Sequence, residues 1–269
     1  MKLDYGSLLS PEPIRLSIGS IRIPTLREIS RLTFLKFNIF QIFLKMSPED
    51  YYTKLNLNKS VIWENMTDEE KESLTLYDIV THDEDACKTY TELFNFFFVE
   101  DVIYKDGIFF VLNESNTTDS NIEITPENLG GIIHEDTFYT MLDILQQVCC
   151  LKNDDILEEK DVKFKNEKAR ILWERMQEAA KENEKKTRGK NNANLSIPNI
   201  ISSVAAKSTS LNINSIWDIT LFQLYDQFNR LQNNDAYSIN SMRVAAWGDE
   251  KKTFDYALWY KNMFDKVQE

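Results

Sequence analysis

The sequence predicts a mainly α-helical protein with a small β element, an α+β fold. Apolar residues recur at helical spacing along most of the chain, and the pair Asp106-Gly107 separates two runs of β-branched and aromatic residues in "EDVIYKDGIFFVL". A second amphipathic region follows a polar stretch near the C-terminal end. We therefore expect a helical N-terminal domain over 1–180 with a β-hairpin near 100–112, a linker over 181–210 and a small helical C-terminal unit over 211–269.

Composition and charge argue against several classes of function. The chain has 269 residues, 42% of them hydrophobic, which is enough for a packed core. Its formal net charge of -12 argues against binding to nucleic acid or to an anionic membrane surface, because both need clustered cations. No apolar run approaches the ~20 residues of a membrane span. Three cysteines without a disulfide pattern, and no apparent signal peptide, favour a cytoplasmic location.

The N-terminal region combines a short hairpin with a long helix. Alternation of apolar and polar residues over 14–23, around Gly19-Ser20, predicts the hairpin. Thr25 and Glu28 have capping-box spacing, and the apolar residues of "LREISRLTFLKFNIFQIFLKM" predict one continuous helix that is buried on most sides.

The middle of the 1–180 domain reads as capped helices around the hairpin. Ser47 and Thr67 are placed as N-caps. The stretch "DACKTYTELFNFFFV" predicts a further helix, with a strand as the alternative for its aromatic end. After the hairpin, "NIEIT" at 121–125 is a candidate third strand. A helix is expected to follow the boundary at Gly130-Gly131.

Residues with catalytic or metal-binding chemistry are present, but their context favours structural roles. The cluster "HDEDAC" at 82–87 has one pair at ligand spacing and no second cluster to complete a metal site. It reads as an acidic helix start, as does His134-Glu135-Asp136. Cys149-Cys150 fits buried packing. We expect no catalytic residues, no metal and no cofactor, with an unrecognised hydrolase as the remaining enzymatic alternative.

A charged stretch precedes the C-terminal unit. Residues 158–190 are rich in both signs of charge and predict a long exposed helix that ends in "KKTRGKNNAN". Its lysines and arginine lack interleaved aromatic residues, so a linker is favoured over a nucleic-acid contact.

The C-terminal helix carries the candidate binding site. In "SIWDITLFQLYDQFNRL", Thr220 and Gln223 have capping-box spacing and an apolar stripe follows. One interpretation is structural: a second helix in the region of 242–259 packs back on the first and forms a helical hairpin. This hairpin either buries its own apolar stripe or docks on the main domain. The other interpretation is a helix that binds a partner. The candidate partner-binding residues are Trp217, Leu221, Leu224, Tyr225, Phe228, Leu231 and Trp247.

The two ends of the chain resemble a known family. The tail "S-x-W-D-I-T-x-x-Q-L-Y-D-x-F-x-R-L" at 215–231, followed by "AAWGD" at 245–249, resembles the tail assembly chaperones of long-tailed bacteriophages and prophages in their long form. The opening "SPEPIRLSIGSIRIPTLREISRLTF" is also similar to their N-terminal regions. The hairpin-bearing stretch 99–125 departs from the family pattern.

The resemblance implies a non-enzymatic function in the cytoplasm of the bacterial host. Such chaperones bind the tape measure protein through the N-terminal part and recruit tail tube protein through the C-terminal unit, and they are absent from the mature virion. Self-association is a further expectation. The alternative within phage biology is a structural tail or connector protein of the virion.

Overall fold

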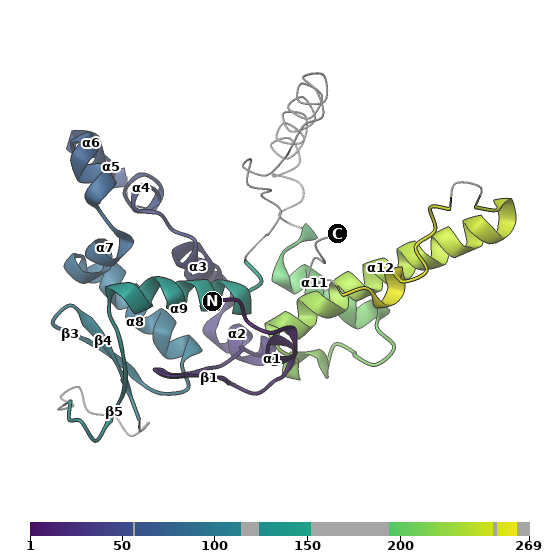
Figure 1. The fold of residues 1–269 in the computed structure, drawn as a ribbon, viewed down its shortest axis with the longest axis horizontal. Coiled ribbons are helices and arrows are strands. Elements are labelled where there is room, and N and C mark those ends of the chain that lie inside the picture. Colours follow the sequence, from purple (N-terminus) through teal and green to yellow (C-terminus); the bar gives the residue numbers. More distant parts are fainter. Residues whose placement is uncertain (56, 114–123, 152–193, 250–251, 263–269) are drawn as a thin grey trace. The chain divides into compact units, whose positions relative to one another are not determined.

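The computed structural model of the protein describes residues 1–55, 57–113, 124–151, 194–249 and 252–262. These residues form two compact units (Figure 1). The N-terminal unit comprises Met1–Leu151 together with Asp218–Gln223. The C-terminal unit contains the described residues 194–217 and 224–262. Helices predominate and both small sheets are antiparallel, which confirms the predicted mainly helical α+β fold.

The N-terminal unit is built from short helices around two small sheets. Its helical elements are α1 (Tyr5–Leu9), α2 (Leu26–Leu32), α3 (Phe34–Leu44), α4 (Pro48–Asp50), the π-helical turn η1 (Tyr51–Leu55), α5 (Leu57–Asn65), α6 (Asp68–Ser73), α7 (Leu76–His82), α8 (Glu84–Phe97) and α9 (Glu135–Val148). The strands are β1 (Ile14–Leu16), β2 (Gly19–Ile21), β3 (Val102–Lys105), β4 (Ile108–Leu112) and β5 (Leu129–Ile133). Helix α8 packs against β3, and α9 packs against β5.

The hairpin predicted near 100–112 is confirmed. Strands β3 and β4 pair with Lys105 opposite Ile108. Asp106 and Gly107 both adopt positive φ, of 50° and 83°, as a type I′ turn requires. The Tyr77 hydroxyl donates a hydrogen bond of 2.6 Å to the Gly107 carbonyl oxygen and thereby ties the turn to α7.

The third strand lies later in the chain than the sequence suggested. It is β5, Leu129–Ile133, whereas the candidate strand at 121–125 falls mainly outside the described residues. The glycines at 130 and 131 belong to β5 and do not mark a loop. A Cβ added at Gly131 would lie 2.4 Å from the Ile18 carbonyl oxygen. Glycine is therefore needed in this strand because another backbone approaches it closely, in the β1–β2 turn.

The N-terminal hairpin is confirmed, with its turn shifted by two residues. Ile14 pairs with Ile21 and Leu16 with Gly19, so Ser17 and Ile18 form the turn and Gly19-Ser20 begins β2. Gly19 has a φ of 143° and packs close to the Phe98 ring. A Cβ added at Gly19 would lie 3.0 Å from the Phe98 ring and 3.0 Å from the side chain of Val111 on β4, which explains why glycine occurs inside this strand.

The long helix predicted after Thr25 is interrupted at Thr33. Thr33 has a φ of 83°, and its side-chain oxygen accepts a hydrogen bond from the Lys36 N–H. It therefore caps a new helix, α3, and α2 ends at Leu32. The prediction of one continuous helix was wrong because a threonine that caps the second helix was read as an interior residue.

Aromatic side chains dominate the core of the N-terminal unit. The fully buried ring of Phe94 on α8 lies 5.1 Å from Phe109 on β4 and 6.1 Å from Phe138 on α9, measured between ring centroids. Phe138 also lies 5.3 Å from Tyr90. Tyr90 is itself buried, and its hydroxyl donates a hydrogen bond of 2.8 Å to the Phe43 carbonyl oxygen. These contacts join α3, α8, α9 and the sheet in one cluster.

The C-terminal unit contains α11 (Ile197–Lys207), most of α12 (Leu221–Trp247) and the 3-10 turn η4 (Leu258–Tyr260), and the 3-10 turn η3 (Ile216–Asp218) precedes α12. Helix α11 lies inside the range 181–210 that was expected to be a linker. Its buried residues Ile197, Ile200, Ile201 and Val204 follow helical spacing, which explains why this part is ordered. Residues 181–193 and the predicted charged helix at 158–190 lie outside the described residues.

Candidate functional site

Helix α12 carries most of the predicted partner-binding residues. It runs without interruption to Trp247, where the sequence suggested a helix ending near 231 and a second one packing back. Gly248, with a φ of 77°, ends the helix, and its N–H donates a hydrogen bond of 2.8 Å to the Val244 carbonyl oxygen. This is the left-handed C-terminal cap typical of glycine.

The predicted capping box at the start of α12 is present. The Thr220 N–H donates to the Gln223 side-chain oxygen at 2.9 Å, and the Gln223 N–H donates to the Thr220 hydroxyl oxygen at 3.2 Å. The Gln223 side-chain amide also donates to the Leu9 carbonyl oxygen at 2.8 Å. The cap therefore also links the helix start to the end of α1.

Backbone hydrogen bonds hold the first turn of α12 to the start of α2. The Leu26 N–H donates to the Ile219 carbonyl oxygen at 3.0 Å, and the Leu221 N–H donates to the Pro24 carbonyl oxygen at 2.9 Å. Thr25 and Thr220 form an antiparallel bridge between these bonds. Segment 218–223 thus adds a short strand-like pairing to the N-terminal unit, nearly 200 residues away in sequence.

An ion pair reinforces this attachment. The Arg27 guanidinium donates from Nε and Nη2 to Asp218 Oδ1, at 2.9 and 2.6 Å. Both side chains are largely exposed, so the pair contributes less than ~1 kcal/mol. The hydrogen bonds and the burial of Leu221 supply most of the attachment.

The predicted partner-binding residues differ widely in exposure. Leu221 and Leu224 are fully buried, so their side chains pack inside the molecule. Trp217, Tyr225, Phe228 and Leu231 are half-buried. Trp247 is 80% exposed and is the most solvent-accessible large apolar residue of the described chain. The structure therefore places these seven residues in three different environments.

The segment after α12 returns toward the helix and exposes further aromatic residues. The Asp249 carboxylate accepts hydrogen bonds from the N–H groups of Phe254 and Thr253, both at 2.9 Å, and these bonds hold its pKa below the usual value. Phe254 lies 5.4 Å from Tyr237 on α12, between ring centroids. Over the described residues 252–262 the return is irregular apart from one 3-10 turn, where the sequence suggested a helix.

Exposed apolar side chains are frequent in the last part of the C-terminal unit's sequence. Six large ones are exposed between positions 239 and 260: Ile239, Met242, Trp247, Tyr256, Trp259 and Tyr260. We call this set the distal aromatic surface. Of these six residues, only Trp247 is among the predicted partner-binding residues, because exposure cannot be predicted from residue type alone.

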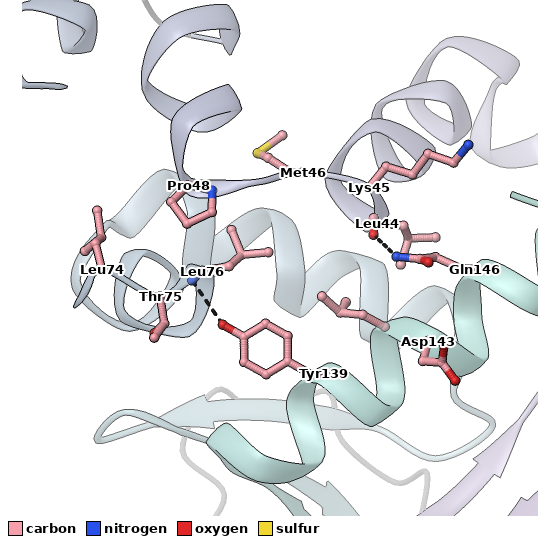
Figure 2. Close-up of a pocket in the computed structure, with 11 residues that line it drawn as sticks. Leu44, Lys45, Met46, Pro48, Leu74, Thr75, Leu76, Tyr139, Asp143 and Gln146 are labelled. Carbon is pink, nitrogen blue, oxygen red and sulfur yellow. Dashed lines mark hydrogen bonds between the residues drawn. The ribbon is translucent and has the colours of Figure 1, made fainter. Parts of the chain in front are cut away.

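A separate apolar groove lies in the N-terminal unit between the end of α3, the start of α7 and α9 (Figure 2). Its volume is about 490 Å³, and leucines at 44, 74, 76 and 142 contribute much of its lining. The Tyr139 hydroxyl accepts a hydrogen bond of 3.1 Å from the Leu76 N–H. The Gln146 side-chain amide donates a hydrogen bond of 2.6 Å to the Leu44 carbonyl oxygen. These polar groups of the groove are thus used in holding the three helices together.

The acidic cluster at 82–87 has a structural role. Asp83 caps α8, accepting hydrogen bonds of 3.1 Å from the N–H groups of Asp85 and Ala86. It also pairs with Lys59, whose ammonium donates to the Tyr51 hydroxyl at 2.9 Å. Burial opposes ionisation of Asp83, but the hydrogen bond from Lys59 keeps the pKa of the carboxyl below its usual value.

Among the described residues, no group of three or more His, Cys, Asp or Glu side chains is arranged to hold a metal ion. Burial raises the pKa of the Cys149 thiol well above its usual value, which disfavours the reactive thiolate. Within the same ranges, every helix is too short or too polar to cross a lipid bilayer.

Comparison with known proteins gives one relationship. Residues 185–264 match the family model of the YomV second domain. No curated protein and no solved structure matches the chain. The matched segment includes α11, α12 and the distal aromatic surface. The match relates this C-terminal part of the chain to phage-derived, prophage YomV-like proteins.

Proposed function

We propose that the protein is a non-enzymatic assembly chaperone for phage tails. In this proposal the N-terminal unit binds the tape measure protein, the C-terminal unit recruits tail tube subunits, and both act in the cytoplasm of the bacterial host. The relationship of residues 185–264 to a phage-derived family supports the phage context. The resemblance of the 215–231 and 245–249 motifs to tail assembly chaperones supports the specific role.

The observation that carries the proposal is the distal aromatic surface. Trp247 is 80% exposed, and Tyr256, Trp259 and Tyr260, which follow it in the sequence, are each more than half exposed. Tryptophan and tyrosine are enriched among the residues that dominate binding energy in protein interfaces. Exposed aromatic residues in this number are therefore typical of a surface that a partner covers.

The net charge of -12 suits the same role. A chaperone that exposes apolar surface must remain soluble at high copy number, and like charges between copies oppose their association. A protein with such a surface and a neutral body would be expected to aggregate.

Co-expression tests the proposal directly. The full chain is produced together with the tape measure protein encoded in the same operon, and the soluble fraction of the tape measure protein is measured. We expect a several-fold increase over expression of the tape measure protein alone. An unchanged soluble fraction would contradict the chaperone role.

The structural alternative has its own measurement. A tail or connector protein is present in the purified virion in stoichiometric amount, whereas an assembly chaperone is absent. Quantitative mass spectrometry of purified particles distinguishes the two. A fixed copy number per particle would replace the chaperone proposal with a structural role.

A further inference from the structure

Helix α3 exposes an apolar stripe on the side that faces away from the core. Leu35, Ile39 and Ile42 are 73%, 39% and 54% exposed. Their spacing of four and three residues places them on one face of the helix, over a length of about 10 Å. We call these three residues the α3 stripe.

The α3 stripe is not required for packing of the N-terminal unit. The opposite face of the same helix supplies Phe37, Phe40, Phe43 and Leu44 to the core, all nearly or fully buried. The helix is therefore apolar on two faces, and only one of them is covered. Leaving three branched aliphatic side chains in water has an unfavourable free energy that a binding partner would relieve.

The stretch of chain that carries the stripe is positively charged in an otherwise acidic protein. Residues 29–48 contain Arg31, Lys36 and Lys45 and no carboxylate, although the whole chain has a net charge of -12. Lys36 pairs with Glu92 on α8 at 2.9 Å. Arg31 and Lys45 are exposed and form no ion pair with any described residue. In the sequence, Arg31 precedes the stripe and Lys45 follows it.

We propose that the α3 stripe binds an amphipathic helix of a partner protein, with apolar residues at three- and four-residue spacing and acidic residues on either side of them. Apolar contact with Leu35, Ile39 and Ile42 would provide the affinity. Arg31 and Lys45 would select acidic flanks over basic ones.

Charge argues against a second copy of this chain as the occupant. A symmetric pairing of two α3 helices would place Arg31 of one copy near Lys45 of the other, or like residues near each other. Either arrangement juxtaposes cations, which is unfavourable. An acidic helix removes this repulsion and offers partners to both cations.

This inference deepens the proposed function, on which it rests for the identity of the natural partner. It assigns the N-terminal unit a binding face and states the chemistry of the helix that the face accepts. The binding chemistry itself can be tested with synthetic peptides, without any phage protein.

The test uses the full chain and two labelled helical peptides of about three heptads. Both have leucine at the a and d positions, and they differ only in having glutamate or lysine at e and g. Fluorescence anisotropy measures binding of each. We expect the acidic peptide to bind at least ~10-fold more tightly than the basic one, at moderate ionic strength.

Variants locate the binding face. Replacing Leu35 and Ile39 with serine should weaken binding of the acidic peptide by ~10-fold or more, because apolar contact is lost. Replacing Val61 and Ile62 on α5 with serine is the matched control, since these residues are also exposed, at 57% and 50%, and binding should be unchanged. Arg31→Glu combined with Lys45→Glu should reverse the preference between the two peptides, and it tests the proposal even if the serine variant fails to fold.

Several results would overturn the inference. If both peptides bound equally, charge would not select the partner. If the α5 control variant lost as much affinity for the acidic peptide as the Leu35/Ile39 variant, the stripe would not be the binding face. A dimer of the unmodified protein that the Leu35/Ile39 variant dissociates, seen by sedimentation, would identify the stripe as a contact between copies. Peptide binding without an effect on the tape measure protein would contradict only the proposed function, and the converse would contradict only this inference.

Discussion

Thr25 and Thr220 lie opposite each other in an antiparallel bridge, and each caps a helix that begins at the next residue. Thr25 forms a capping box with Glu28 at the start of α2, and Thr220 forms one with Gln223 at the start of α12. Two helix starts from opposite ends of the sequence are thus joined backbone to backbone. This junction fixes the beginning of α12 in the N-terminal unit.

The Thr220 cap should stabilise the fold measurably. Thr220 is fully buried, and Thr220→Ala removes the hydroxyl that accepts from the Gln223 N–H. We expect the free energy of unfolding to fall by ~1–2 kcal/mol, measured by urea denaturation. Thr67→Ala is the matched control, because Thr67 has the same capping box at the exposed start of α6. A loss at Thr220 no larger than at Thr67 would contradict a special role for the junction.

Substitutions at Leu221 and Trp247 should have opposite effects: the first should lower stability, and the second should lower binding of tube protein. Leu221 is fully buried, so Leu221→Ala should lower the free energy of unfolding by ~2–5 kcal/mol. Trp247 is 80% exposed, so Trp247→Ala should change stability by less than ~0.5 kcal/mol and reduce capture of tube protein. Thermal unfolding and a pull-down with purified tube protein are the measurements. Full capture by the Trp247 variant would show that the distal aromatic surface is not the tube-binding site.

Gly131 should be irreplaceable, in contrast to its neighbour. The Cβ introduced by Gly131→Ala would lie 2.4 Å from a backbone oxygen of Ile18, so either the β1–β2 turn or β5 must move. We expect a loss of ~1–3 kcal/mol or more in unfolding free energy. In Gly130→Ala the nearest atom, at 2.7 Å, belongs to the side chain of Asn113, which can rotate away. Similar losses at both positions would contradict the close approach of the two backbones.

The pairing of Asp83 with Lys59 should make stability depend on pH in the acid range. The pKa of Asp83 is lowered in the folded protein, so the stabilisation is present above the unfolded pKa near 3.8 and is lost as pH falls through the lower folded value. Asp83→Asn should therefore cost about 1 kcal/mol at pH 7 and progressively less below pH ~4. Chemical denaturation at a series of pH values measures this difference.

Glu92→Gln provides the comparison for the pH series. Glu92 pairs with Lys36, but both side chains are more than 40% exposed, so the expected loss is under ~0.5 kcal/mol. If the Asp83 variant showed a constant loss at all pH values, its effect would not come from the charge of the carboxylate, since asparagine can accept the same capping hydrogen bonds.

Local chemistry made several features predictable from the sequence alone. The capping boxes at Thr25, Thr67 and Thr220 and the turn at Asp106-Gly107 all occur where the sequence predicts them. Each depends on side chains within three residues of one another, so residue type and spacing are sufficient. The mainly helical fold class follows from the same local patterns.

Tertiary contacts decide which residues and which helix faces are buried, and local sequence patterns do not. The sequence predicts a boundary at Gly130-Gly131, whereas both residues lie in a strand and the close approach of the Ile18 backbone requires glycine at position 131. Helix α3 has two apolar faces, and its sequence does not say which one the aromatic core covers. The apolar stripe of α12 is buried at Leu221 and Leu224, whereas Trp247 at its far end is exposed. The sequence by itself determined where the helices capped by Thr25, Thr67 and Thr220 and the turn at Asp106-Gly107 begin, because those choices are made within a few residues. Burial and exposure were decided by the tertiary structure, because they depend on which distant segments pack against each face.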